Sequence, residues 1–118
     1  MSERTFRIKI RGTFDRLSPG QRAELLARAA EHDVLNAAFT PAGSLTYDLA
    51  ARPFFTFRFA ESGERAEDAD PATERALAAT RAWMDERGYG YKDLKPTVED
   101  LAEAPLSKRQ RRDLAANS

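Results

Sequence analysis

The feature that most limits what this chain can fold into is a run of alternating phenylalanines between residues 54 and 59. Phe55, Phe57 and Phe59 stand two residues apart, so in an extended strand their side chains share one face. Burying each ring stabilises the fold by roughly 1.5 to 3 kcal/mol. The pattern therefore predicts a strand whose phenylalanine face lies at the centre of the hydrophobic core.

A second strand is predicted near the N-terminus, where the apolar residues Phe6, Ile8 and Ile10 alternate with polar ones. If these apolar residues face the core, the cations of both strands share the open face of the sheet: Arg7, Lys9, Arg11 and Arg58. Neighbouring cations repel one another. We therefore expect a counter-charge from Asp48, Glu99, a partner subunit or an anionic ligand.

Two helices are predicted from their start and stop signals. A proline follows a capping residue at both starts, Pro19 and Pro71. The first helix is expected to end near residues 32–33, and Gly88 is expected to end the second.

The other connections are less regular. Residues 34–40 are predicted to form a short extra strand in a hairpin with residues 44–49. Residues 61–70 are charged and are expected to form a solvated loop. A last strand is predicted over residues 94–98, at a sheet edge because Pro96 cannot donate a ladder hydrogen bond.

This order of elements, βαββαβ with an extra short hairpin strand, indicates an α+β ferredoxin-like sandwich. In that fold an antiparallel sheet has two helices on one face, and its first and third strands are usually central. A chain of 118 residues has the size of one domain. We predict a single domain over residues 1–101 and a flexible basic tail over residues 102–118.

The amino-acid composition limits the kinds of binding and catalysis that this chain can carry out. The 19 Lys plus Arg balance the 19 Asp plus Glu, so any attraction to nucleic acid or membranes must come from local clusters. The absence of cysteine excludes disulfides, thiol nucleophiles and thiolate zinc sites. We expect no metal, because a single histidine cannot build a His-rich site and the carboxylates of residues 61–70 form no metal motif. No cofactor is expected either, since the sequence has no phosphate-binding glycine loop, and no nucleophile elbow is present. The N-terminal residues lack a long apolar run, so no membrane contact and a cytoplasmic location are predicted.

The open sheet face is the first candidate site. Its cations would clamp an anionic or polar small molecule, and the predicted ligand-binding residues are Arg7, Lys9, Arg11 and Arg58. The alternative is a solvated face of long side chains. Tyr89 and Tyr91 either line a ligand mouth or cap the core. Small domains of this architecture often pair face to face, so a homodimer through the sheet face is also expected.

Three side chains are candidate proton carriers: His32, Tyr47 and Asp48. His32 is the only histidine. It would act as a general base if the hairpin places Tyr47 or Asp48 beside it, and otherwise it caps the helix electrostatically. The first hypothesis is thus a small-molecule-binding domain, or a cofactor-independent enzyme of bacterial specialised metabolism. The sequence leaves both alternatives open.

The second hypothesis is a nucleic-acid or nucleoprotein contact through the tail, which carries a cluster of cations: Lys108, Arg109, Arg111 and Arg112. Such a tail can equally be a solubilising end. Recognition of RNA by the sheet is disfavoured, because only Phe54 offers an aromatic ring on the open face. The third hypothesis is a module that docks another protein on that face.

Four segments carry a resemblance to other proteins. They are RGTFD (11–15), AEHDVL (30–35), GYGY (88–91) and APLSKRQRR (104–112). With them, nearly the full length of the chain resembles a family of short actinobacterial proteins of unknown function. The resemblance implies a bacterial cytosolic protein and carries over no site residue.

Overall fold

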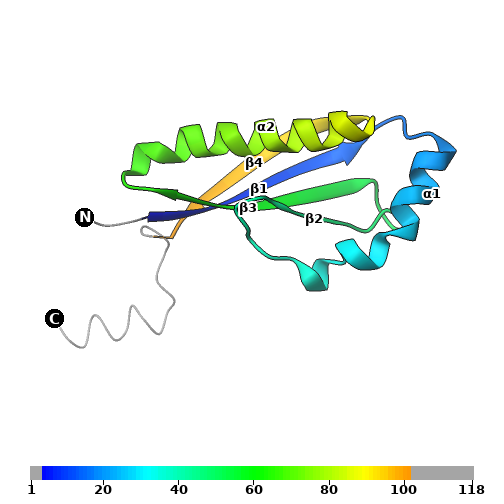
Figure 1. Ribbon diagram of the computed structural model, residues 1–118, viewed down its shortest axis with the longest axis horizontal. Coiled ribbons are helices and arrows are strands. Elements are labelled where there is room, and N and C mark those ends of the chain that lie inside the picture. The colour runs from blue at the N-terminus through cyan, green and yellow to red at the C-terminus, as the bar shows by residue number, and fades with distance from the viewer. Residues whose placement is uncertain (1–3, 102–118) are drawn as a thin grey trace.

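The computed structural model describes residues 4–101, which form a four-stranded sheet with a long helix along one face (Figure 1). The helices and strands are, in chain order, β1 (Arg4–Phe14), α1 (Pro19–Ala27), β2 (Ser44–Tyr47), β3 (Phe54–Gly63), α2 (Ala69–Arg87) and β4 (Tyr91–Asp100). All strand pairs are antiparallel, and the strands lie in the order β2-β3-β1-β4. The predicted α+β class is confirmed, and β1 and β3 are central as expected.

The core lies between the sheet and α2. Ile8 of β1 is directly opposite Phe59 of β3, and Ile10 is opposite Phe57. These four side chains are at most 3 % exposed. The helix covers them with one buried stripe: Ala72, Ala76, Leu77, Thr80 and Met84. The two apolar faces predicted from alternation therefore meet in one core.

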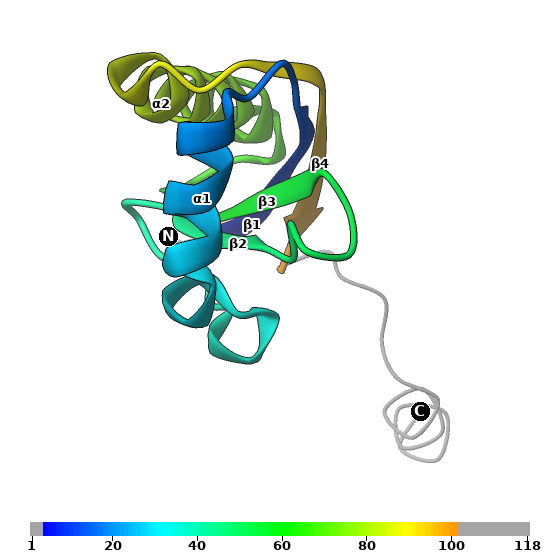
Figure 2. The same ribbon diagram turned by 90° about the vertical axis from the view of Figure 1, so that its right-hand side faces the viewer.

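α1 begins as the sequence predicts, but it ends at Ala27 and not near residues 32–33. The Ser18 hydroxyl accepts a hydrogen bond from the Gln21 N–H, and the Gln21 side chain accepts one from the Ser18 N–H. Only Leu25 of this helix is buried, so the helix has a small apolar contact area. Figures 1 and 2 show that α1 crosses the end of the sheet, whereas α2 runs along its length. The sequence predicts two helices on one face: α2 lies along that face, whereas α1 lies at the end of the sheet and joins the same core through Leu25.

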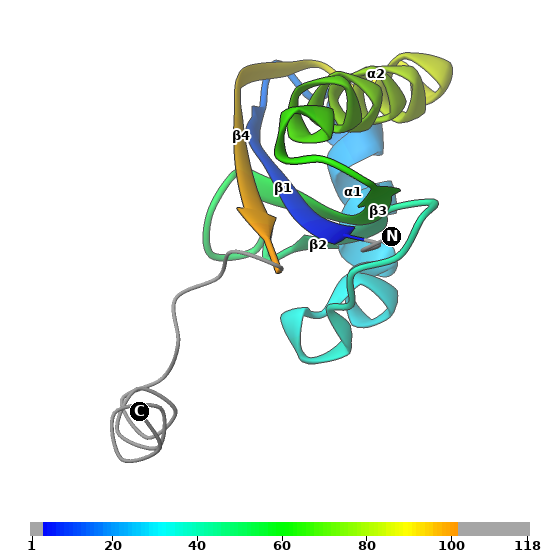
Figure 3. The same ribbon diagram turned by 90° about the vertical axis from the view of Figure 1, so that its left-hand side faces the viewer.

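The prediction of a hairpin strand over residues 34–40 is wrong. Two short 3₁₀ turns, η1 (Ala29–His32) and η2 (Val34–Asn36), replace most of it, and β2 pairs with β3. The Asp33 carboxylate accepts a hydrogen bond from the Leu35 N–H at the start of η2. Such a local bond competes with extended pairing. In Figure 3 the strands lie between α2 and these cyan turns.

The predicted loop over residues 61–70 is shorter than expected. β3 continues to Gly63, and a 3₁₀ turn, η3, leads into α2. Asp68 closes this connection, because its carboxylate accepts hydrogen bonds from the N–H groups of Glu64 and Arg65. These bonds hold the pKa of Asp68 below its usual value.

The glycine predicted to end α2 and the proline predicted to lie in an edge strand are both found in those positions. Gly88 ends α2 with a φ of 70°, in the left-handed region that glycine adopts without steric cost. Pro96 lies in β4, an outer strand of the sheet, opposite Ile10 of β1. Among residues 4–101, no helix is long and apolar enough to span a membrane.

The predictions made for the tail concern residues 102–118. This segment and its cations Lys108, Arg109, Arg111 and Arg112 lie outside the described residues. The proposed division into a domain and a tail therefore stays a prediction.

Candidate functional site

The open face of the sheet, opposite α2, carries the predicted cations. Arg7, Lys9 and Arg11 are exposed and alternate with the buried residues of β1. Arg58 of β3 stands directly opposite Lys9, and Lys95 of β4 stands directly opposite Arg11. Like charges at directly opposite positions destabilise a sheet. The centre of this face therefore holds two repulsive cross-strand pairs.

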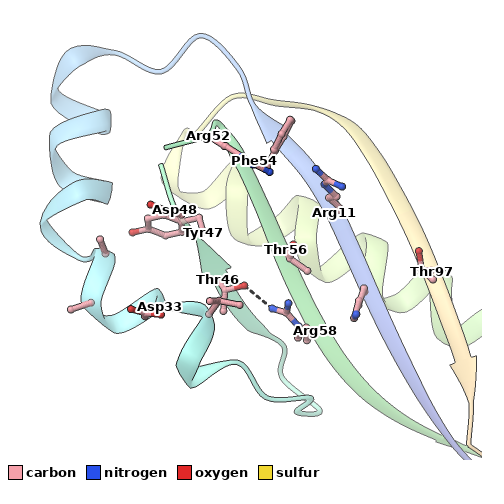
Figure 4. Close-up of a pocket in the computed structure, with 14 residues that line it drawn as sticks. Arg11, Asp33, Thr46, Tyr47, Asp48, Arg52, Phe54, Thr56, Arg58 and Thr97 are labelled. Carbon is pink, nitrogen blue, oxygen red and sulfur yellow. Dashed lines mark hydrogen bonds between the residues drawn. The ribbon is translucent and has the colours of Figure 1, made fainter. Parts of the chain in front are cut away.

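A pocket of about 710 Å³ lies on this face, between the strands and the turns η1 and η2 (Figure 4). Its floor is made by open-face residues of the strands, and part of its wall is made by Ala29, Ala30 and Val34. Its charged lining consists of Lys9, Arg11, Arg52, Arg58, Asp33 and Asp48. Four cations face two carboxylates, so the pocket has an excess of positive charge. We call it the basic pocket.

Two of the arginines are positioned by neighbours. Arg58 Nη1 donates a hydrogen bond of 2.6 Å to Thr46 Oγ1, and Thr46 is buried. The Arg11 guanidinium lies over the Phe54 ring, 4.6 Å from its centroid. A cation–π contact of this kind leaves the N–H groups of the guanidinium available for a planar anion.

The expected counter-charges do not neutralise these cations. Within residues 4–101, no cation of the basic pocket forms an ion pair. Asp33 accepts the backbone hydrogen bond that starts η2, and Asp48 is exposed. Glu99 stands opposite Arg7 in the strand register. The surplus charge of the pocket is therefore open to an external anion.

Arg7 does not line the basic pocket. Its guanidinium lies over the Phe39 ring, 5.2 Å from the centroid. Phe39 belongs to the irregular chain before β2, so strand alternation could not place it on the open face. The open face thus has an aromatic ring near each end, Phe39 and Phe54, and each is covered by an arginine of β1.

Sequence reasoning also missed two cations of the open face. Arg52 lines the pocket from the connection between β2 and β3, where no periodic signal exists. Lys95 could have been found, because residues 94, 96 and 98 were expected to share one face and residue 95 therefore had to point the other way.

His32 and Tyr47 lie together, on the α1 side of the pocket. The rings are 5.1 Å apart. The Tyr47 hydroxyl donates a hydrogen bond to the Leu25 carbonyl, and His32 Nδ1 donates one to the Leu45 carbonyl at 3.2 Å. Burial raises the pKa of Tyr47 to about 12. At neutral pH this phenol keeps its proton, and that proton is already engaged by the main chain.

The candidate proton carriers do not converge on the floor of the pocket. Tyr47 and Asp48 border it, whereas His32 is not among the residues that line it. Figure 4 shows Tyr47 and Asp48 on the side of the η turns, away from Arg11. Among residues 4–101, no group of three or more His, Asp or Glu side chains has the geometry to hold a metal ion.

Tyr89 and Tyr91 cap the core, and neither lines the basic pocket. Tyr89 packs against Trp83 with ring centroids 6.0 Å apart, and burial raises its pKa. Between the two tyrosines, a Cβ on Gly90 would collide with the Asp15 carbonyl. The GYGY and RGTFD segments therefore meet at Gly90 and Asp15, where the Asp15 N–H also donates a hydrogen bond to the Gly90 carbonyl.

Taken together, the fold and the basic pocket define a small α+β domain with a cationic open face. The chain belongs to a family of unknown function, DUF6204, whose model matches residues 1–112. No curated protein and no solved structure matched it in the two further comparisons. The resemblance to a family of unknown function is confirmed, and the actinobacterial source stays a prediction.

Proposed function

We propose that this protein binds an anionic small molecule in the basic pocket. The observation that carries the proposal is the surplus of cations at the pocket, which no ion pair within residues 4–101 offsets. Lys9 and Arg58 repel each other across neighbouring strands. A bound anion between them would replace this repulsion by attraction.

The size and lining of the pocket support a small ligand. A volume of about 710 Å³ is within the range of roughly 300 to 1,000 Å³ that is typical of small-molecule sites. The apolar contribution comes from Ala29, Ala30, Val34 and Phe54. This combination suits a molecule that has a charged group and a compact apolar body.

Binding is better supported than catalysis. The Tyr47 hydroxyl is committed to the Leu25 carbonyl, and a pKa of about 12 makes it a poor acid or base at neutral pH. Asp48 at the pocket edge and His32 behind it are the residues that an enzymatic function would use. No catalytic step is part of this proposal.

We also propose that the fold is ferredoxin-like and that the protein is cytoplasmic and of actinobacterial origin. The βαββαβ order and the central position of β1 and β3 support the fold, although α1 lies at the end of the sheet. A homodimer through the sheet face would bring two basic surfaces together, so it requires an anion between the copies.

The test is a thermal-shift and calorimetric screen of the full chain against small organic anions, matched neutral compounds, and short RNA and DNA. The variant Arg58→Gln removes one pocket cation, and Arg81→Gln is the matched control, because Arg81 is exposed on α2. We expect an organic anion to stabilise the wild type and the control and to lose most of its effect on Arg58→Gln.

Equal stabilisation of Arg58→Gln and wild type would overturn the proposal, as would the absence of binding by every small anion. A response to nucleic acid alone would favour the tail hypothesis. A variant in which Lys108, Arg109, Arg111 and Arg112 are all glutamine tests it directly: loss of a salt-sensitive response would assign the contact to the tail.

A further inference from the structure

We propose that the ligand is a dianion whose two charged groups are held by two separate cationic centres in the basic pocket. This inference rests on the proposed function and specifies the class of ligand. The first centre consists of Lys9 and Arg58, and the second consists of Arg11 and Arg52 beside Phe54.

The strand register separates the two centres. Lys9 and Arg58 occupy one cross-strand row, whereas Arg11 occupies the next row on the same face, opposite Thr56. Same-face positions of a strand are about 7 Å apart, since each residue advances about 3.3 Å. Figure 4 shows the same division: Arg58 lies with Thr46, and Arg11 and Arg52 lie near Phe54. The cations therefore form two sites along β1 and not one cluster.

The first centre combines a fixed arginine with a lysine. Because Arg58 Nη1 is held by Thr46 Oγ1, the direction of its guanidinium is set before any ligand arrives. Lys9 adds a point charge beside it. One carboxylate or phosphate group can contact both side chains, and this neutralises the repulsion between them.

The second centre is built for a planar group. The Arg11 guanidinium lies over Phe54, 4.6 Å from the ring centroid, so the aromatic face contacts it without using its N–H donors. A carboxylate in the plane of the guanidinium accepts two parallel hydrogen bonds in this geometry. Arg52, on the same side of the pocket, adds charge without belonging to the strand.

The uncharged residues that line the pocket limit the shape of the part of the ligand that joins its two charged groups. Thr56 and Thr46, which stand opposite each other on β3 and β2, line the pocket beside the two centres. The facing wall presents the small apolar side chains of Ala29, Ala30 and Val34. A short hydrocarbon chain or a flat ring fits this surface. The ligand class is thus a dicarboxylate, or a carboxylate joined to a phosphate, with a compact apolar link.

The charge balance agrees with this class. Four cations and two carboxylates line the pocket, so two positive charges remain, and a dianion neutralises both. A monoanion would leave one centre repulsive.

The test compares matched ligands by calorimetry at low salt on the full chain. Adipate is compared with hexanoate, in which a methyl group replaces one carboxylate, and terephthalate is compared with 4-methylbenzoate. Succinate and suberate vary the spacing of the two carboxylates. We expect a dianion to bind at least about ten-fold more tightly than its matched monoanion, with a maximum at the intermediate length of adipate.

Variants assign the two charged groups to the two centres. Arg11→Gln and Arg58→Gln should each reduce the affinity for the dianion to about that of the monoanion, while Arg81→Gln leaves it unchanged. Equal affinity for dianion and monoanion would overturn the two-centre inference and leave the proposed anion site standing. Failure of every organic anion to bind would overturn both.

Discussion

The two faces of β1 contribute to stability in opposite ways, although their residues alternate along one strand. On one face Phe6, Ile8 and Ile10 are fully buried and meet the phenylalanines of β3. On the other face Lys9 and Arg11 stand opposite further cations. The first face lowers the free energy of the folded state, and the second raises it. The comparison shows that the core face stabilises the fold, whereas the open face carries unfavourable cross-strand charge pairs.

The largest effect expected from this contrast is on the core face. Phe57→Ala removes a ring that is 3 % exposed, and we expect a loss of about 3 to 5 kcal/mol in the free energy of unfolding because a cavity remains. Thr56→Ala, the adjacent residue on the open face, loses only strand propensity and should change it by at most about 1 kcal/mol. Urea denaturation measures both. Comparable losses in the two variants would contradict the division into two faces.

The next largest loss of stability is expected at Gly12, where the core is tightly packed. A Cβ on Gly12 would collide with the Phe55 ring and come within 2.7 Å of Leu94, so Gly12→Ala should destabilise the protein by about 1 to 3 kcal/mol. Gly20→Ala is the matched control, since the nearest atom would be 3.9 Å away. Thermal denaturation should show no loss of stability for that control. A Gly12→Ala variant as stable as the wild type would mean that the side chains around Gly12 can move to accept a methyl group, against this prediction.

A smaller effect is expected where the core face meets the wall of the pocket. Tyr47→Phe removes the hydrogen bond to the Leu25 carbonyl, which also accepts from the Arg28 N–H. The carbonyl keeps a partner, so the expected loss is only about 0.5 to 1.5 kcal/mol.

The same residue has a pH signature. The pKa of Tyr47 rises from 10.0 to about 12 on folding, so above pH 10 the unfolded state releases this proton first. The associated stability is complete below pH 10 and is lost as the pH rises toward 12. Denaturation at several pH values should show this loss in the wild type and a smaller loss in Tyr47→Phe. Identical pH dependence in the two proteins would contradict the burial of this phenol.

The smallest expected change in stability is an increase, and it concerns a cation of the open face. Lys9→Thr removes the repulsion with Arg58 and should stabilise the ligand-free protein by about 0.2 to 1 kcal/mol. Lys92→Thr controls for strand propensity, because Lys92 stands opposite Thr13 and its ion pair with Asp15, at 3.9 Å, is solvent-exposed and contributes little to stability. Calorimetric melting curves should show an increase in Tm for Lys9→Thr that exceeds the change in the control. A decrease would mean that Lys9 contributes to folding, against the interpretation of the open face.

The sequence predicts the parts of the molecule that depend on short-range patterns. Alternation placed Lys9, Arg11 and Arg58 on one face, and the capping box at Ser18 located the start of α1. The wall of the pocket was not predictable in this way. Val34 and Leu35 look like part of a strand in sequence, but they are 62 % and 89 % exposed in η2.

The pairing of β2 with β3 determines that residues 34–40 do not form a strand. This pairing is a tertiary contact, which local sequence patterns do not reveal. Once β2 occupies the edge of β3, the chain before it keeps only a single bridge to the sheet, between Thr40 and Phe59. Phe39 lies in this irregular chain, and Arg52 lies in the connection between β2 and β3. Their positions follow from tertiary contacts, so the floor of the candidate site was accessible to sequence reasoning and its wall was not.

The two hydrogen bonds that link α1 and η1 to β2 have an evolutionary consequence. They run from Tyr47 to the Leu25 carbonyl and from His32 to the Leu45 carbonyl, and between them they fasten an irregular segment that contributes few residues to the core. Insertions or deletions in such a segment leave the sheet intact. Related proteins can therefore widen or narrow the pocket while they keep the sheet, and on the proposed function we expect the length between residues 28 and 43 to vary with the size of the bound anion.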